Sequence, residues 1–226
     1  MALYAIGDTH LSLGSDKPMD VFGGAWSGYM EKLAEGFSVL RPEDTLVVAG
    51  DVSWGMSLEE AGPDFAWLNA WPGTKILMKG NHDCWWNTAA KMNRFFEEHG
   101  FSTLKILHNN CHLYGETALC GTRGWFYEAE KEGQKVFNRE LMRLEASLKA
   151  AGEREKLCFL HYPPCYTGYT CQPILDLLER YEVTACYYGH LHGGSHRLAL
   201  QGMRGSVTYA MISADYLSFR PLRLLD

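Results

Sequence analysis

The chain contains 226 residues, of which 46% are hydrophobic and 21% charged, a composition typical of globular proteins. At this length we expect one domain spanning residues 1–226. The formal net charge is −6, and no run of Lys or Arg resembles a nucleic-acid-binding surface. Long nucleic acids are therefore disfavoured as partners, although bound metal cations would attract phosphate whatever the overall charge.

Cysteine usage and hydropathy predict the compartment of the protein. The seven cysteines are odd in number and form no Cys-x-x-Cys pair, which argues against a disulfide framework and against a cysteine-type zinc site. The N-terminal segment has no basic region, and its apolar run is too short for a signal peptide. No apolar run approaches the roughly 18 residues of a membrane span. We expect a cytoplasmic protein without membrane association.

Strands and helices alternate along the first hundred residues. Strands are expected at residues 3–7, 45–49 and 75–78, and helices at residues 29–40, 57–70 and 88–99. The second helix is expected to begin at Ser57, because Glu60 follows three residues later as in a capping box.

The pattern changes after residue 104. Residues 104–125 contain short β-like pieces with Asn-Asn and Gly punctuation, which predict hairpins rather than strand–helix–strand units. A helix at 136–151, a strand at 157–160, a helix at 172–181, a strand at 184–188 and three β-like runs within 196–225 are expected to follow. This order predicts an α/β protein whose mixed sheets are covered by helices.

Side chains that bind metals follow five of the predicted strands. These clusters are Asp8 with His10, Asp51, Asn81 with His82 and Asp83, His161, and His190 with His192. In open α/β sheets, ligands bind just outside the carboxyl ends of the strands. We therefore expect the five clusters to converge on one edge.

The chemistry of these residues suits a metal centre. Two carboxylates, several imidazoles and an amide oxygen can hold two first-row transition metals, and Asp51 is the best bridging candidate because its two oxygens can be shared. Two cations roughly 3.5–4 Å apart would polarise a phosphoryl group and lower the pKa of a shared water. Each cluster alone is more simply explained by a turn or a surface pair. Their common position at strand ends indicates a metal site.

Together the segments resemble the signature of the calcineurin-like metallophosphoesterase superfamily, D-x-H, G-D, G-N-H-D/E, H and G-H-x-H. In this chain they read Gly7-Asp8-Thr9-His10, Gly50-Asp51, Gly80-Asn81-His82-Asp83, His161 and Gly189-His190-Leu191-His192. The resemblance implies a four-layer α/β/β/α sandwich with two mixed sheets. It also implies two divalent or trivalent ions of manganese, iron or zinc, the first bound by Asp8, His10, Asp51 and His192, the second by Asp51, Asn81, His161 and His190.

The resemblance implies a catalytic role for His82, which would contact the scissile phosphate and protonate the leaving oxygen. Many protein phosphatases of the superfamily orient this histidine with an aspartate three residues after the bridging one, a position filled here by Trp54. Asp83 or a backbone carbonyl is therefore expected to orient His82. The chain is more similar to small prokaryotic members that act as phosphatases or phosphodiesterases.

The expected activity is hydrolysis of a small phosphorylated substrate, a monoester or a small diester, by a hydroxide that bridges the two metals. Arg123 lies in a Gly-flanked loop, where it either binds the phosphate bidentately or pairs with an acidic neighbour. Two alternatives remain open, namely a non-catalytic metal-binding scaffold of the same fold and a nuclease-type phosphodiesterase. The sequence does not indicate the oligomeric state.

Overall fold

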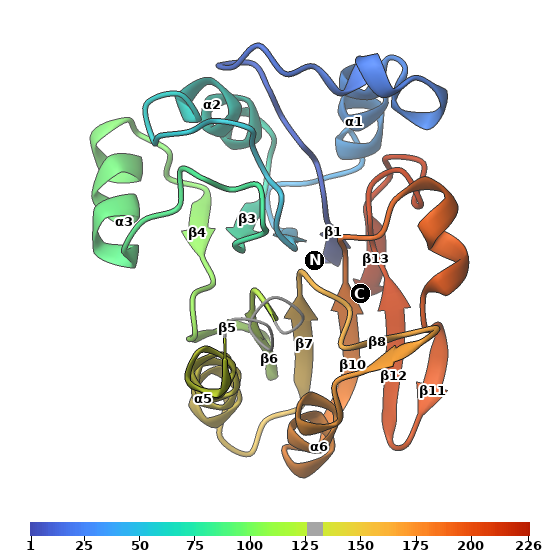
Figure 1. The fold of residues 1–226 in the computed structure, drawn as a ribbon. Coiled ribbons are helices and arrows are strands. Elements are labelled where there is room, and N and C mark those ends of the chain that lie inside the picture. The colour runs from blue at the N-terminus through green and yellow to red at the C-terminus, as the bar shows by residue number, and fades with distance from the viewer. Residues whose placement is uncertain (126–132) are drawn as a thin grey trace.

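A computed structural model describes residues 1–125 and 133–226 of the chain (Figure 1). Five strands form the first sheet, in the order β13-β1-β2-β3-β4. Their bounds are β1 Leu3–Ile6, β2 Thr45–Val48, β3 Thr74–Leu77, β4 Leu104–Ile106 and β13 Leu222–Leu225. Strands β1 to β4 are parallel to their neighbours, whereas β13 is antiparallel to β1. The sheet is therefore mixed.

Six strands form the second sheet, in the order β11-β12-β10-β7-β6-β5. Their bounds are β5 Cys111–Tyr114, β6 Thr117–Thr122, β7 Lys156–Leu160, β10 Val183–Tyr188, β11 Gly202–Arg204 and β12 Val207–Met211. The four central strands are parallel, and the two edge strands are antiparallel to them. A separate two-stranded hairpin joins β8 (Cys165–Tyr166) to β9 (Tyr169–Thr170).

The helices cover the outer faces of the two sheets, with α1–α3 against the first and α5 and α6 against the second (Figure 1). Their bounds are α1 Tyr29–Phe37, α2 Gly62–Ala70, α3 Ala89–Glu98, α5 Gln134–Ala150 and α6 Gln172–Arg180, with 3-10 turns at Met19–Phe22, Gly24–Trp26 and Gly193–Leu198. Buried side chains of the two sheets, such as Val47 and Phe159, pack against each other in a third core between them. These four layers confirm the predicted α/β/β/α sandwich.

Two expectations need correction. The second helix begins at Gly62 rather than at Ser57. The Ser57 hydroxyl does accept a hydrogen bond from the Glu60 amide, at 3.2 Å, but the chain forms turns there, and the helix starts only where Pro63 occupies its first turn. Hairpins alone do not describe residues 104–125, because only β5 and β6 form one. Strand β4 instead lies parallel to β3 after the α3 crossover, as in a strand–helix–strand unit.

Among the described residues, no helix is long and apolar enough to cross a membrane.

Candidate metal centre

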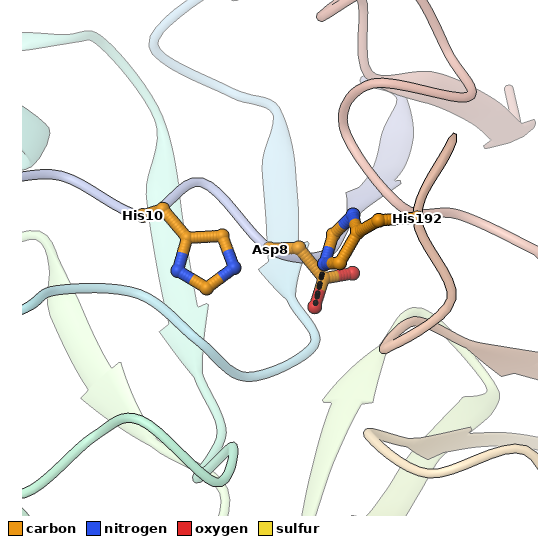
Figure 2. Close-up of side chains that lie close together, drawn as sticks. All are labelled: Asp8, His10 and His192. Carbon is orange, nitrogen blue, oxygen red and sulfur yellow. Dashed lines mark ion pairs between the residues drawn. The ribbon is translucent and has the colours of Figure 1, made fainter. Parts of the chain in front are cut away.

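The carboxyl ends of β1, β2, β3, β7 and β10 bring together the five clusters predicted from the sequence. Asp8, His10 and His192 each place one ligand atom within 4.8 Å of those of the other two, and so do Asp8, Asp51 and His161. Figure 2 shows Asp8 between His10 and His192, with the Asp8–His192 pair marked. Asp8, His10, Asp51 and His161 are almost completely buried. The predicted convergence is therefore present in the structure.

Asp51 lies between two histidines. Its Oδ2 atom is 3.7 Å from His10 Nε2 and 3.5 Å from His161 Nε2. Its Oδ1 atom accepts a hydrogen bond of 2.7 Å from the backbone amide of His82. One carboxylate oxygen thus faces ligand candidates on both sides, the position that a bridging carboxylate requires.

The Asn81 side chain lies between two of the histidines of the site. Its Oδ1 atom lies 2.7 Å from His161 Nε2 and 2.9 Å from His190 Nδ1. The other nitrogen of His161, Nδ1, lies 3.2 Å from the carbonyl oxygen of Ala49, which leaves Nε2 to face Asn81. An amide oxygen and two imidazole nitrogens therefore converge on one point.

Four of these residues adopt a backbone conformation that non-glycine residues rarely adopt. Asp8, His10, Asp51 and His190 have φ angles of 58°, 46°, 49° and 73°. Left-handed backbone of this kind costs of order 1–3 kcal/mol per residue and is concentrated at functional sites. The local hydrogen bonds hold it in place, since the amide of Asp8 donates to Gly50 O and the amide of His10 donates to Asp51 O, both at 2.9 Å.

Two glycines before the ligands allow the backbone to approach the carboxylates. A Cβ atom on Gly80 would lie 2.1 Å from Asp51 Oδ1, and one on Gly189 would lie 2.4 Å from Asp8 Oδ2. Neither distance is sterically possible. The glycines of the Gly-Asn-His-Asp and Gly-His-x-His segments are thus required by the packing of the neighbouring carboxylate.

Burial and neighbouring charges set the protonation of the site. Burial lowers the pKa of His10 and of His190 to about 3, so both imidazoles are neutral at neutral pH, the form that binds metals. Burial alone would raise the pKa of Asp51, but His161 and His10 outweigh it and bring this pKa to about 2. The bridging candidate is therefore ionised. The Nδ1 atom of His10 is buried and has no hydrogen-bond partner among the described residues.

The His82 ring packs against Trp54, the residue at the position where protein phosphatases have an aspartate. The ring centroids of His82 and Trp54 are 4.4 Å apart, and Trp54 also stacks on His10 at 5.1 Å. The Trp54 indole is held in turn by a 3.4 Å contact from its Nε1 to Met19 Sδ. An aromatic side chain therefore packs against His82 at the position where the resemblance to protein phosphatases implies an aspartate.

Asp83 ties two loops of the site together. Its Oδ1 atom accepts hydrogen bonds from the amides of Val52 and Ser53 and from Trp85 Nε1, at 2.8, 3.1 and 2.9 Å. Its Oδ2 atom accepts one of 2.7 Å from the Gly80 amide. These four bonds fix the loop that carries Asn81 and His82. The role that they indicate for Asp83 is to position this loop.

Asp215 completes the centre and was not predicted from the sequence. Its Oδ1 atom lies 2.9 Å from His192 Nδ1, and its Oδ2 atom accepts a 3.0 Å hydrogen bond from the Gly193 amide and lies 3.1 Å from His196 Nε2. His192 Nε2 is then directed to Asp8 Oδ1 at 3.7 Å. A carboxylate on the second nitrogen of a metal-binding histidine fixes its tautomer and orientation. Asp215 lies outside every recognised motif, so only its position after β12 could have indicated it.

Arg123 follows β6 at the same edge. Its carbonyl oxygen accepts hydrogen bonds of 3.1 Å from the amides of His161 and Tyr162. Its guanidinium carbon lies 4.5 Å from the Trp125 ring centroid and 5.8 Å from that of Tyr162, and Nε is buried without a hydrogen-bond partner in the part of the chain that the structure describes. No ion pair joins Arg123 to an acidic side chain among those residues. The alternative of a structural ion pair thus receives no support from the described residues.

Comparisons with known proteins agree with this geometry. Residues 1–194 match the family described as calcineurin-like phosphoesterase, and the chain belongs to this family. A comparison with curated proteins gives no match. Among solved structures, a protein of unknown function from Aquifex aeolicus, AQ665, is 17% identical with a TM-score of 0.55, covering 98% of this chain and 95% of its own.

A second solved structure, TT1561 of Thermus thermophilus, is 10% identical with a TM-score of 0.54, covering 99% of this chain and 97% of its own. At these identities the two structures establish a shared fold only. The family and the clustered Asp and His side chains together support a metal-dependent phosphoesterase.

Proposed function

We propose that the protein hydrolyses a phosphate ester of a small molecule with the help of two transition-metal ions. The observation that carries this proposal is the convergence of the buried Asp8, Asp51 and His161 side chains with His10 and His192 around one point. Nitrogen and oxygen donors in this combination suit manganese, iron or zinc. Membership of the calcineurin-like phosphoesterase family supports the same reaction class.

The donors divide into two sets with Asp51 between them. Asp8, His10 and His192 would complete the first set. Asn81, His161 and His190 would complete the second, since the Asn81 oxygen lies within 2.9 Å of both imidazoles. Bound there, the metals would supply charge neutralisation on the phosphoryl oxygens and a lowered pKa for a nearby water.

His82 would supply the proton for the leaving oxygen. Burial lowers the pKa of His82, so the free site holds it neutral at neutral pH. A phosphate dianion close to the ring would raise this pKa again, because an opposite charge favours the protonated form. Trp54 would keep the ring in place by packing against it at a tilted angle, while leaving its nitrogens free for the substrate. Arg123 would bind an oxygen of a substrate phosphate group, as proposed from the sequence.

The test is a paired assay on the chain purified anaerobically and supplied with Mn or Fe. The two substrates are p-nitrophenyl phosphate and bis(p-nitrophenyl) phosphate, which release the same phenol from a monoester and a diester. We expect turnover of at least one substrate, loss of turnover with a chelator, and its return when metal is added back. A chain that binds two metals and turns over neither ester would contradict the proposal and favour the non-catalytic scaffold.

A further inference from the structure

A cavity of about 380 Å³ opens beside the metal centre and is rich in cationic side chains. It is lined by Lys79, Arg123, Arg139 and Arg143 and by one carboxylate, that of Glu140. Four cations against one anion, counted over the described residues, is an unusual balance in a chain whose formal net charge is −6. A local excess of positive charge in a concave site attracts anions.

Most of the charged side chains that line this cavity have no ion pair among the residues that the structure describes. Arg143 forms an ion pair with Glu140, which lies three residues earlier on α5. Lys79, Arg123 and Arg139 have no ion pair with any of the residues in 1–125 and 133–226. Three cations therefore remain without an acidic partner in the described part of the molecule.

Buried hydrogen-bond donors accompany these charges. Arg123 and Trp86 both line this cavity. Their Nε and Nε1 atoms are buried and have no hydrogen-bond acceptor among the described residues. A buried donor without an acceptor is unfavourable, and an anion that accepts from it would remove this cost. Burial lowers the pKa of His108 in the same cavity, and the positive charges of Arg143 and Lys79 lower it further. The cavity thus offers N–H groups and positive potential to an oxygen-rich anion.

The topology places this cavity next to the proposed metals. Lys79 follows β3 two residues before Asn81, and His108 follows β4. Arg123 follows β6, the neighbour of β7, after which His161 lies. In the first sheet the metal centre lies after β3 and the cavity extends to the end of the neighbouring strand β4. In the second sheet the metal centre lies after β7 and the cavity extends to the end of the neighbouring strand β6. Neighbouring strands are about 4.8 Å apart, so the two sites are separated by roughly one to two strand spacings, about 5–10 Å.

We infer that this cavity is a subsite for a second phosphate group of the substrate, so that the enzyme acts on small molecules carrying two phosphates. This inference rests on the proposed phosphoesterase function. One phosphate is bound and cleaved at the metal centre. The other is held, uncleaved, by Lys79 and the three arginines, whose guanidinium groups match phosphate in bidentate geometry.

Matched substrate pairs test the inference. Adenosine 3′,5′-bisphosphate is compared with adenosine 5′-monophosphate, and glucose 1,6-bisphosphate with glucose 6-phosphate, in the metal-loaded enzyme at low ionic strength. We expect kcat/KM to be higher for the bisphosphate by about tenfold or more, which corresponds to about 1.4 kcal/mol. Arg139→Gln removes an exposed cation of the cavity and is expected to bring this ratio close to one. Arg154→Gln, which removes an arginine that does not line the cavity, is the matched control and is expected to keep it.

A binding measurement separates the subsite from catalysis. Inorganic pyrophosphate is titrated calorimetrically into protein stripped of metal with EDTA, where the phosphoesterase reaction cannot occur. We expect binding that weakens severalfold in Arg139→Gln and is unchanged in Arg154→Gln. Failure to hydrolyse any phosphate ester would count against the proposed function. The titration tests anion binding in the cavity independently of hydrolysis. Two results would overturn the inference of a subsite. One is an active enzyme with equal kcat/KM values within both substrate pairs, and the other is pyrophosphate binding that is equally strong in the wild type and in Arg139→Gln.

Discussion

Asp215 holds the Nδ1 atom of His192 at 2.9 Å and thereby turns Nε2 towards Asp8. This contact joins the loop after β12 to the Gly-His-x-His segment after β10. The two strands are parallel neighbours, so their carboxyl ends meet at the same edge. The orientation of a proposed ligand thus depends on a residue 23 positions further along the chain.

Replacing Asp215 by Asn should weaken metal binding without unfolding the protein. The amide keeps the shape but loses the charge that holds His192, and loss of such a partner typically costs about 10–100-fold in metal affinity. Titration of Mn into the metal-free protein measures the change. Asp176→Asn, on the exposed face of α6, is the control. Equal affinities for both variants would show that Asp215 does not position His192.

His82→Ala should abolish turnover and leave the metal content nearly intact. The His82 side chain contributes none of the proposed metal ligand atoms, and its backbone amide, which holds Asp51, is unchanged by the substitution. Loss of a general acid typically lowers the rate by about 10²–10⁴-fold. Steady-state assays and elemental analysis on the same preparation check both parts. A mutant as fast as the wild type would remove His82 from the mechanism.

Gly189→Ala should damage the centre far more than Gly194→Ala, five residues later. The new Cβ on residue 189 would lie 2.4 Å from Asp8 Oδ2, whereas a Cβ on residue 194 would meet nothing within 4 Å. Overpacking of this kind typically costs about 1–3 kcal/mol. Thermal unfolding and metal content of the two variants provide the comparison. Similar losses in both would mean that the clash is relieved without moving Asp8.

Asp64 should make stability fall as the pH rises through about 6. Burial raises the pKa of Asp64 from 3.8 to about 6, while its hydrogen bonds from Ser53 and the Leu13 amide act in the opposite direction. The folded protein therefore binds a proton that the unfolded chain releases near pH 4. This contribution is fully present below pH 4 and is lost as the pH rises past 6.

The measurement is the difference in Tm between wild type and Asp64→Asn from pH 4 to pH 7. The amide cannot ionise, so the wild type should lose stability relative to the variant across this range, on the order of 1–3 kcal/mol. Other carboxylates titrate in both proteins and cancel in the difference. A constant difference in Tm would mean that Asp64 ionises normally in the folded state.

Local signals in the sequence predicted most of the fold and the ligand clusters. Strand ends followed by Asp, Asn or His were visible because strand and ligand are adjacent in the chain. The register that brings Asp8 beside His192 was inferred only from the general rule for strand ends. Asp215 and Trp54 could not be assigned this way, because the role of each depends on a side chain that approaches from another strand or loop.

The helix beginning at Gly62 shows a different limit. Ser57 and Glu60 satisfy the local rule for a helix start, and the hydrogen bond from the Glu60 amide to the Ser57 hydroxyl is indeed present. The segment nevertheless turns, with the Met56 amide bonded to Glu60 Oε2 at 2.9 Å and residue 55 packed closely against Ala61. Tertiary contacts therefore decided the boundary against the local pattern.

The left-handed backbone at Asp8, His10, Asp51 and His190 has an evolutionary consequence. At these four positions the side chain is a proposed metal ligand, whereas glycine would relieve the strain in the backbone. In a descendant that no longer binds metals, the side chains at these positions are free to change, but the strain in the backbone remains. Drift towards glycine at these positions would then stabilise the fold while erasing its chemistry. Glycine at two or more of them in a homologous sequence would therefore mark a member that has abandoned hydrolysis.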